Sequence, residues 1–143
     1  MSDGNVIRLR YEINSGDFAG AWESCADLKR VLSRAGFSSE VSRRAISALY
    51  EGVINIVIHA DYGRVSVDIE PDKIIIEIND QGPGISELEF AMREGYSRAS
   101  DSARSLGFGA GSGLPNMRRF ADAMELCSAA GAGTRVKMVF DAR

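Results

Sequence analysis

The sequence predicts an α+β fold, a two-layer sandwich in which helices cover one face of a mixed β-sheet. Three observations lead to this prediction. Apolar and polar residues alternate in several short segments, as they do in strands with one buried face. Apolar residues recur at helical spacing in two long segments between the first and the second strand. The expected order along the chain is β-α-α-β-β-(α)-loop-α-β-β, without an internal repeat.

The chain is expected to begin with a strand and a helix. Residues 6–13 alternate as a half-buried strand. Asp17 is a suitable N-cap for the following helix, and Gly36 is a suitable end. Phe18 and Trp22 belong to the apolar positions that recur along this helix, so both are expected to face the core.

A second, longer helix is expected to follow. Ser38 or Ser39 can cap its N-terminus, because serine hydroxyls accept hydrogen bonds from the first turn. The apolar pattern continues to His59 or Ala60. A turn at residues 61–63, Asp-Tyr-Gly, is expected to end the helix.

The second half of the chain supplies the remaining elements. Two strands should form a hairpin, and two further strands should close the sheet after a glycine-rich loop and a helix. The expected ranges are 65–69 and 73–79 for the hairpin, 86–93 for a short helix, 95–112 for the loop, 114–121 for the helix, and 124–128 and 134–140 for the last strands.

Length and composition are those of one ordinary domain, spanning residues 1–143. The net charge of −3 and the absence of a clustered basic stripe argue against a nucleic-acid partner. No apolar run approaches the roughly 20 residues that a membrane span needs, and no signal pattern opens the chain. Cys25 and Cys127 lack metal-site spacing and are expected to be reduced, buried thiols. We therefore expect a cytoplasmic protein.

The long second helix carries a polar stripe. Glu51, Asn55 and His59 are spaced i, i+4, i+8, so they share one face of an otherwise apolar helix. An amide oxygen suits Mg²⁺, which keeps several waters and shares phosphate ligands. A carboxylate one turn away can act as a general base. The alternative is that the stripe is simply the solvent face of the helix, with His59 making a local hydrogen bond.

Two glycine turns add to this pattern. Residues 80–84, Asp-Gln-Gly-Pro-Gly, end an apolar strand where a carboxylate could accept a hydrogen bond from an exocyclic amine. Residues 107–113 precede a helix start at Leu114, so their amides could bind an anion. The second turn is neither a Walker A sequence nor a Rossmann fingerprint. An ordinary tight turn and a flexible linker are the respective alternatives.

The joint order of these motifs resembles the GHKL nucleotide-binding (Bergerat) fold of gyrase, Hsp90, histidine kinases and MutL. The shared features are the E-x-x-x-N helix, the D-x-G-x-G turn, the glycine-rich lid and the Gly-Ala-Gly-Thr segment at residues 131–134. The similarity spans about residues 6 to 140. It is greatest with the small anti-sigma and switch-protein serine/threonine kinases, the RsbT-like stressosome kinases among them.

The resemblance implies a role for each motif residue. Glu51 would be the general base, Asn55 would ligate Mg²⁺, and Asp80 would bind the adenine amino group of ATP. The other implied nucleotide contacts are Gly82, Gly84 and Ile85 at the adenine pocket, Gly109, Gly111, Gly113 and Leu114 over the phosphates, and Thr134 beside Asp80. The ATP lid would span about residues 95–112, and its segment 98–108 is longer than the family's compact lid.

The implied activity is ATP-dependent serine/threonine phosphorylation of a STAS-domain protein, an anti-sigma-factor antagonist or stressosome scaffold, in a bacterial partner-switching pathway. The alternative is a nucleotide-gated binding module that sequesters or activates a regulator, a sigma factor or a PPM-type phosphatase, with little turnover. A gyrase-type ATP hydrolase or a sensor histidine kinase is less expected, because the sequence shows neither a transducer domain nor dimerisation helices.

Overall fold

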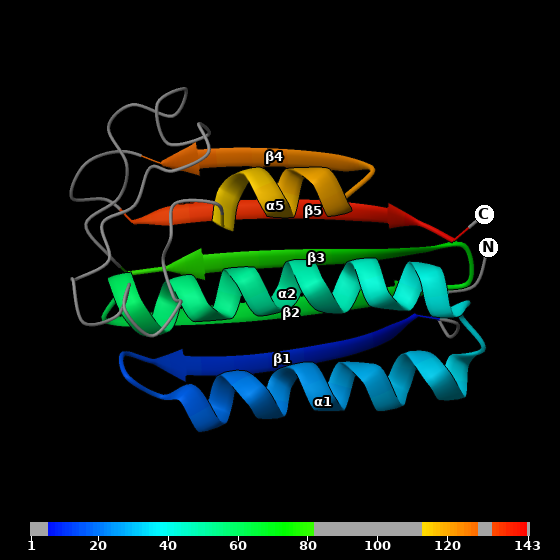
Figure 1. Cartoon of the computed structure of the whole chain (residues 1–143), viewed down its shortest axis with the longest axis horizontal. Helices are drawn as coiled ribbons and strands as arrows, with labels where there is room; N and C mark the ends of the chain where they lie inside the picture. The colour runs from blue at the N-terminus through cyan, green and yellow to red at the C-terminus, as the bar shows by residue number, and fades with distance from the viewer. Residues whose placement is uncertain (1–5, 82–112, 129–132, 143) are drawn as a thin grey trace.

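The computed structural model describes residues 6–81, 113–128 and 133–142. Within these residues, five strands form one sheet, and three helices lie against a single face of it (Figure 1). None of these helices is long and apolar enough to cross a bilayer. The elements are β1 (Ile7–Asn14), α1 (Phe18–Ala35), α2 (Ser39–His59), β2 (Tyr62–Glu70), β3 (Lys73–Asp80), α5 (Gly113–Phe120), β4 (Ala123–Ser128) and β5 (Thr134–Asp141).

The predicted two-layer α+β sandwich is confirmed, with one correction to the sheet. Its strand order is β1-β2-β3-β5-β4, and every neighbouring pair is antiparallel, so the sheet is not mixed. The chain passes through α5 between β3 and β4, and these two strands do run in the same direction. They are not neighbours, however, because β5 lies between them and pairs antiparallel with both.

Helix α1 has the predicted ends, and most of its predicted apolar face is buried, but two of the expected core residues are not. The Asp17 carboxylate accepts a hydrogen bond from the Gly20 backbone N–H at 2.8 Å, and Gly36 ends the helix in the left-handed conformation. Phe18 and Trp22, expected in the core, have exposed fractions of 38% and 64%. They lie to the solvent side of the buried row, where the Trp22 ring packs against Tyr50 of α2, with ring centroids 5.6 Å apart.

Helix α2 begins and ends where the sequence predicts. The Ser38 hydroxyl accepts a hydrogen bond from the Val41 backbone N–H at 3.2 Å, and His59 is the last helical residue. The turn expected at residues 61–63 is wrong at its second and third positions, because Tyr62 and Gly63 already belong to β2. Pairing with β1 and β3 extends β2 back to Tyr62, so the strand begins almost directly after α2.

The two cysteines differ in environment. Cys25 is buried in α1, and its burial raises the pKa of the thiol to about 11. Cys127 is exposed, so the expectation of two buried thiols is wrong for this residue. It lies in the edge strand β4, whose alternate residues Met124 and Leu126 are the ones packed against the core.

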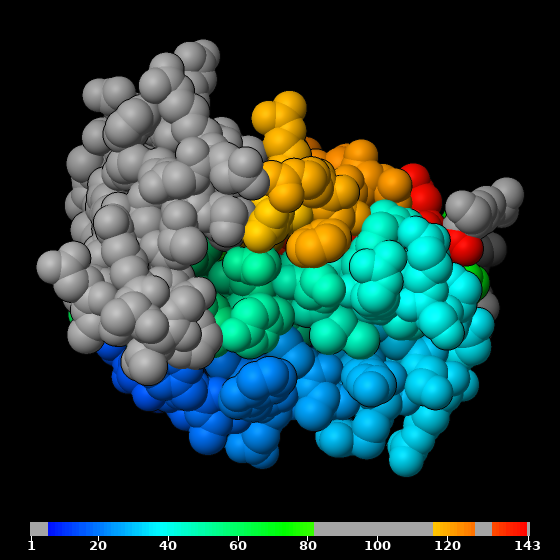
Figure 2. Space-filling view, in the orientation of Figure 1, coloured from blue at the N-terminus to red at the C-terminus, as the bar shows by residue number. Residues whose placement is uncertain are grey.

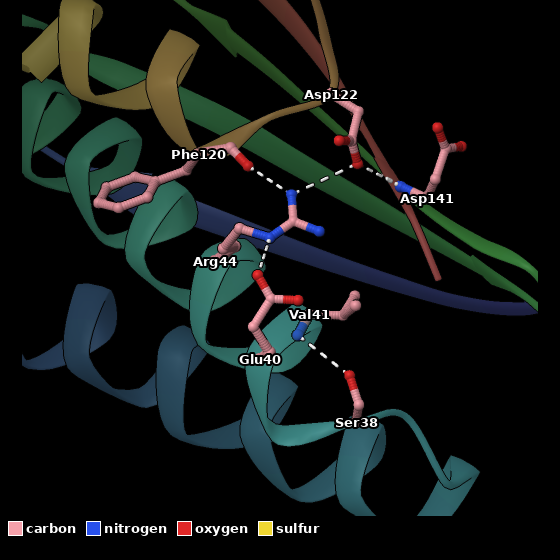
Figure 3. Close-up of polar contacts among 7 residues, drawn as sticks. All are labelled: Ser38, Glu40, Val41, Arg44, Phe120, Asp122 and Asp141. Carbon is pink, nitrogen blue, oxygen red and sulfur yellow. Dashed lines mark hydrogen bonds and ion pairs between the residues drawn. The ribbon is translucent and has the colours of Figure 1, made fainter. Parts of the chain in front are cut away.

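Arg44 joins α2 to the C-terminal end of α5 (Figure 3). Its Nη1 donates to the Phe120 carbonyl oxygen at 2.8 Å and lies 3.3 Å from a carboxylate oxygen of Asp122. The same Asp122 oxygen accepts the Asp141 backbone N–H at 2.7 Å. A cation at a helix C-terminus satisfies a carbonyl that has no partner within the helix. Arg44 therefore fixes the end of α5 to both α2 and β5.

Replacing Arg44 by Met should lower the free energy of unfolding by about 1–2 kcal/mol, since a charge-assisted hydrogen bond to a part-buried carbonyl is lost. Arg43→Met is the matched control. Arg43 is exposed one position earlier on the same helix, and its replacement should change stability by less than about 0.5 kcal/mol. Urea denaturation measures both, and equal losses in the two variants would contradict the role given to Arg44.

Candidate functional site

Gly52 of α2 packs against side chains of both β3 and α5. A Cβ added there would lie 2.1 Å from Cδ1 of Ile78 in β3 and 3.6 Å from Sδ of Met117 in α5. An alanine at this position would require the Ile78 side chain to rearrange. Gly52 is thus packed between β3 and α5.

Glu51 is half-buried where α2 meets α5. The Asn116 side chain of α5 hydrogen-bonds the Glu51 carboxylate. Burial raises the pKa of Glu51, and the Asn116 hydrogen bond acts in the opposite direction by favouring the charged form. Asn116 in turn accepts a hydrogen bond from Nη1 of Arg119 at 2.7 Å. Glu51 is thus the end of a polar chain from α5 and does not lie on an open solvent face.

Asn55 and His59 continue the stripe towards the C-terminal end of α2, and both are half-buried. Among the described residues, no group of three or more His, Cys, Asp or Glu side chains could hold a metal ion. A single neutral amide oxygen does fit Mg²⁺ when phosphates and waters supply the other ligands.

Asp80 ends β3 in the middle of the sheet. It pairs with Gly63 of β2 on one side and with Thr134 of β5 on the other. Its Oδ1 accepts a hydrogen bond from the Thr134 backbone N–H at 3.1 Å. Because Ile78 and alternate residues before it are buried beneath the helices, Asp80 lies on the helix-covered face. The expected proximity of Thr134 and Asp80 is confirmed.

Gly133 is fitted against the backbone of Asp80. It has φ of 81°, and a Cβ there would lie 2.2 Å from the Asp80 carbonyl oxygen. No side chain can be accommodated without moving the end of β3. The glycine before Thr134 therefore holds β5 close to the Asp80 backbone.

The carboxyl end of β3 and the C-terminal end of α2 lie at the same edge of the molecule, at the left of Figure 1. The Asp80–Thr134 pair and the Asn55 end of the stripe consequently belong to one region. Gly113 begins α5, in agreement with the expected helix start near Leu114. The remaining predicted contacts, Gly82, Gly84, Ile85, Gly109 and Gly111, lie outside the described residues, as do the expected lid at 95–112 and the expected helix at 86–93.

Sequence reasoning did not identify Asn116 as a site residue. It precedes Met117, which is 1% exposed, so the helical pattern places it beside a core position. That pattern alone cannot show that the neighbouring position faces Glu51, since the relative placement of α2 and α5 is a tertiary feature. The useful signal would have been an amide within a short, amphipathic helix that follows the glycine-rich turn.

The substitution Gly133→Ala should destabilise the fold through two effects, the unfavourable positive φ and the clash with the Asp80 backbone. Gly36→Ala is the matched control, because Gly36 has φ of 85° but no atom within 4 Å of an added Cβ. We expect Gly36→Ala to cost about 1 kcal/mol and Gly133→Ala to cost about 1–3 kcal/mol more. Chemical denaturation measures both, and equal costs would refute a close approach at Asp80.

A family model for histidine kinase-, DNA gyrase B- and HSP90-like ATPases matches residues 40–143 of the chain. The chain is also 32% identical over 148 residues to the serine/threonine-protein kinase RsbT of Bacillus subtilis, and the match covers 97% of each protein. The anti-sigma F factor of Clostridium beijerinckii is 35% identical over 96 residues, or 63% of this chain and 64% of the relative.

Solved structures show the same fold at low sequence identity. The RsbU and RsbW domains of a Mycobacterium tuberculosis protein match with a TM-score of 0.63 and 14% identity, covering 96% of this chain and 33% of that one. A chain of the SiaB–SiaC complex from Pseudomonas aeruginosa matches with a TM-score of 0.58 and 10% identity, covering 96% and 91%. The family match over residues 40–143 and the relative matched over 97% of both chains show that this chain belongs to the GHKL family of histidine kinase-, gyrase- and HSP90-like ATPases.

Proposed function

We propose that this chain is an ATP-dependent protein serine/threonine kinase of the partner-switching type. The observation that carries the proposal is the environment of Glu51, a half-buried carboxylate held by Asn116 one helical turn before Asn55. A carboxylate in such an environment can take a proton and is oriented by its hydrogen bond. The full-length similarity to a serine/threonine-protein kinase supports this activity.

The proposed reaction transfers the γ-phosphoryl group of ATP to a serine or threonine hydroxyl of a partner protein. Glu51 accepts the hydroxyl proton as the oxygen bonds to the γ-phosphorus, and the bond from that phosphorus to the bridging oxygen breaks to release ADP. Asp80, which the Thr134 N–H orients, accepts a hydrogen bond from the adenine amino group. Gly113 and Leu114 at the start of α5 would contact the phosphates, together with Gly109 and Gly111.

Asn55 would hold Mg²⁺, which neutralises charge on the phosphates when it is bound. The adenine pocket would be completed by Gly82, Gly84 and Ile85.

We further propose that the protein acts in the cytoplasm, where ATP is available, on a STAS-domain antagonist or scaffold. Added phosphate would switch the partner's interface through its charge. A sigma factor or a PPM-type phosphatase is the proposed downstream partner.

The test is incubation with labelled ATP and a candidate STAS-domain protein from the same organism, followed by mapping of the labelled residue. We expect transfer to a serine or threonine in the wild type and a loss of roughly 10²-fold or more in Glu51→Gln, typical of a missing general base. Glu51→Gln should still bind a fluorescent ATP analogue. Glu125→Gln, on the exposed side of β4, is the control and should keep the wild-type rate.

The outcomes separate the hypotheses. Wild-type transfer by Glu51→Gln would rule out Glu51 as the base. Nucleotide binding without transfer to any STAS-domain protein would favour the nucleotide-gated binding module. Loss of nucleotide binding in Asn55→Ala or Asp80→Ala, with folding retained, is expected if these residues hold the metal and the adenine.

The pH dependence of transfer should report on Glu51. Burial raises the pKa of Glu51 above the ordinary glutamate value of about 4.3. As the pH is lowered, the transfer rate should therefore begin to fall at a pH above that of an ordinary glutamate. In Asn116→Ala the donor that favours the charged form is lost, and the acid limb should move to higher pH still.

Asn14→Ala is the control for this experiment, since Asn14 is exposed at the end of β1 and is not among the residues that shift the pKa of Glu51. Its pH profile should overlay that of the wild type. A lower rate in Asn116→Ala with an unmoved acid limb would mean that Asn116 supports the fold and does not tune Glu51.

A further inference from the structure

A surface groove of about 390 Å³ lies where the C-terminal part of α1 meets the N-terminal part of α2. These parts of the two helices are at the right of Figure 2. The basic side chains that line it are Lys29 from α1 and Arg43 from α2. Ser33 and Ser42 are two of its four serines, so hydroxyl groups lie beside the cations. Hydroxyls and cations together are suited to carboxylate oxygens.

The groove lies in the most basic part of an acidic chain. Residues 28–47 contain five cationic side chains and a single carboxylate, whereas the whole chain has a net charge of −3. Arg30 pairs with Asp27, and Arg44 pairs with Glu40 and Asp122. For Lys29 and Arg43, no carboxylate of the described residues lies within ion-pair distance. The two groove cations are therefore available to an outside anion.

The groove also has an apolar part. Phe37 and Ile46 line it and are only partly buried against the core. A small inorganic anion would make no use of this surface. A polypeptide that carries both carboxylate and apolar side chains would satisfy the cations and cover the apolar part at once.

We propose that this groove binds an acidic segment of a partner protein. Carboxylates of that segment contact Lys29 and Arg43, and an apolar side chain rests on Phe37 and Ile46. Asn55 is thirteen positions after Ser42 in α2, which is about 20 Å along a helix. The contact is thus distinct from the nucleotide site and does not depend on the proposed kinase activity.

Fluorescence anisotropy with a defined probe tests the proposal on the full chain. The probe is a fluorescein-labelled peptide made of Glu-Glu-Leu-Glu repeats, measured at low and at physiological ionic strength. We expect saturable binding that weakens about tenfold or more in the double variant Lys29→Glu/Arg43→Glu. Glu51→Gln should bind the peptide as the wild type does, which separates this result from a failure of the proposed kinase function.

The matched control is Arg8→Glu/Arg10→Glu, which changes the net charge equally but on exposed β1 positions that alternate with the core-facing ones. It should bind the probe nearly as tightly as the wild type, and far-UV circular dichroism should show all variants folded. Equal weakening in the two double variants would overturn the proposal, because net charge alone would then explain binding. Absence of binding to the wild type, or equal displacement by a single-stranded DNA of the same charge, would overturn it too.

Discussion

The packing of α2 against α5 is the contact on which the arrangement of the site depends. Gly52 lies within this packing, where an added Cβ would come 2.1 Å from Cδ1 of Ile78 and 3.6 Å from Sδ of Met117, so the Ile78 side chain would have to rearrange. Glu51, the neighbouring residue, meets Asn116 of α5 across the same contact. Helix α5 has eight residues, too few to be stable in isolation. The fold of α5 therefore depends on its packing against α2, and the candidate site in turn depends on α5.

One face of α2 makes two polar contacts to α5. Arg44 binds the carbonyl of Phe120 at the C-terminal end, and Glu51 contacts Asn116 in the middle of the helix. Arg44 and Glu51 are seven residues apart, two helical turns, so they project from one side of α2. These two polar contacts, with Met117 buried between them in sequence, fix both the position and the rotation of α5. The start of α5, where phosphate contacts are proposed, is placed by these contacts.

Local patterns predicted the elements well because their causes are local. Asp17, Ser38 and Gly36 act as caps through bonds within one or two turns, and alternation identified the strands. The misplaced features have non-local causes. Whether the sheet is mixed depends on β5 inserting between β3 and β4, and the exposure of Trp22 depends on how α1 lies beside Tyr50. The contact of Asn116 with Glu51 arises in the same way, from the packing of two helices distant in sequence.

The carboxylate at Glu51 is not explained by stability. Its folded-state pKa is raised, so between the unfolded pKa and the folded pKa the folded protein binds more protons, and stability falls as the pH rises through this window. At neutral pH the ionised side chain therefore opposes folding. A glutamine of nearly the same shape would accept the Asn116 hydrogen bond through its amide oxygen without this cost. The role proposed for Glu51 as a general base would give this carboxylate a function that a neutral isostere could not supply.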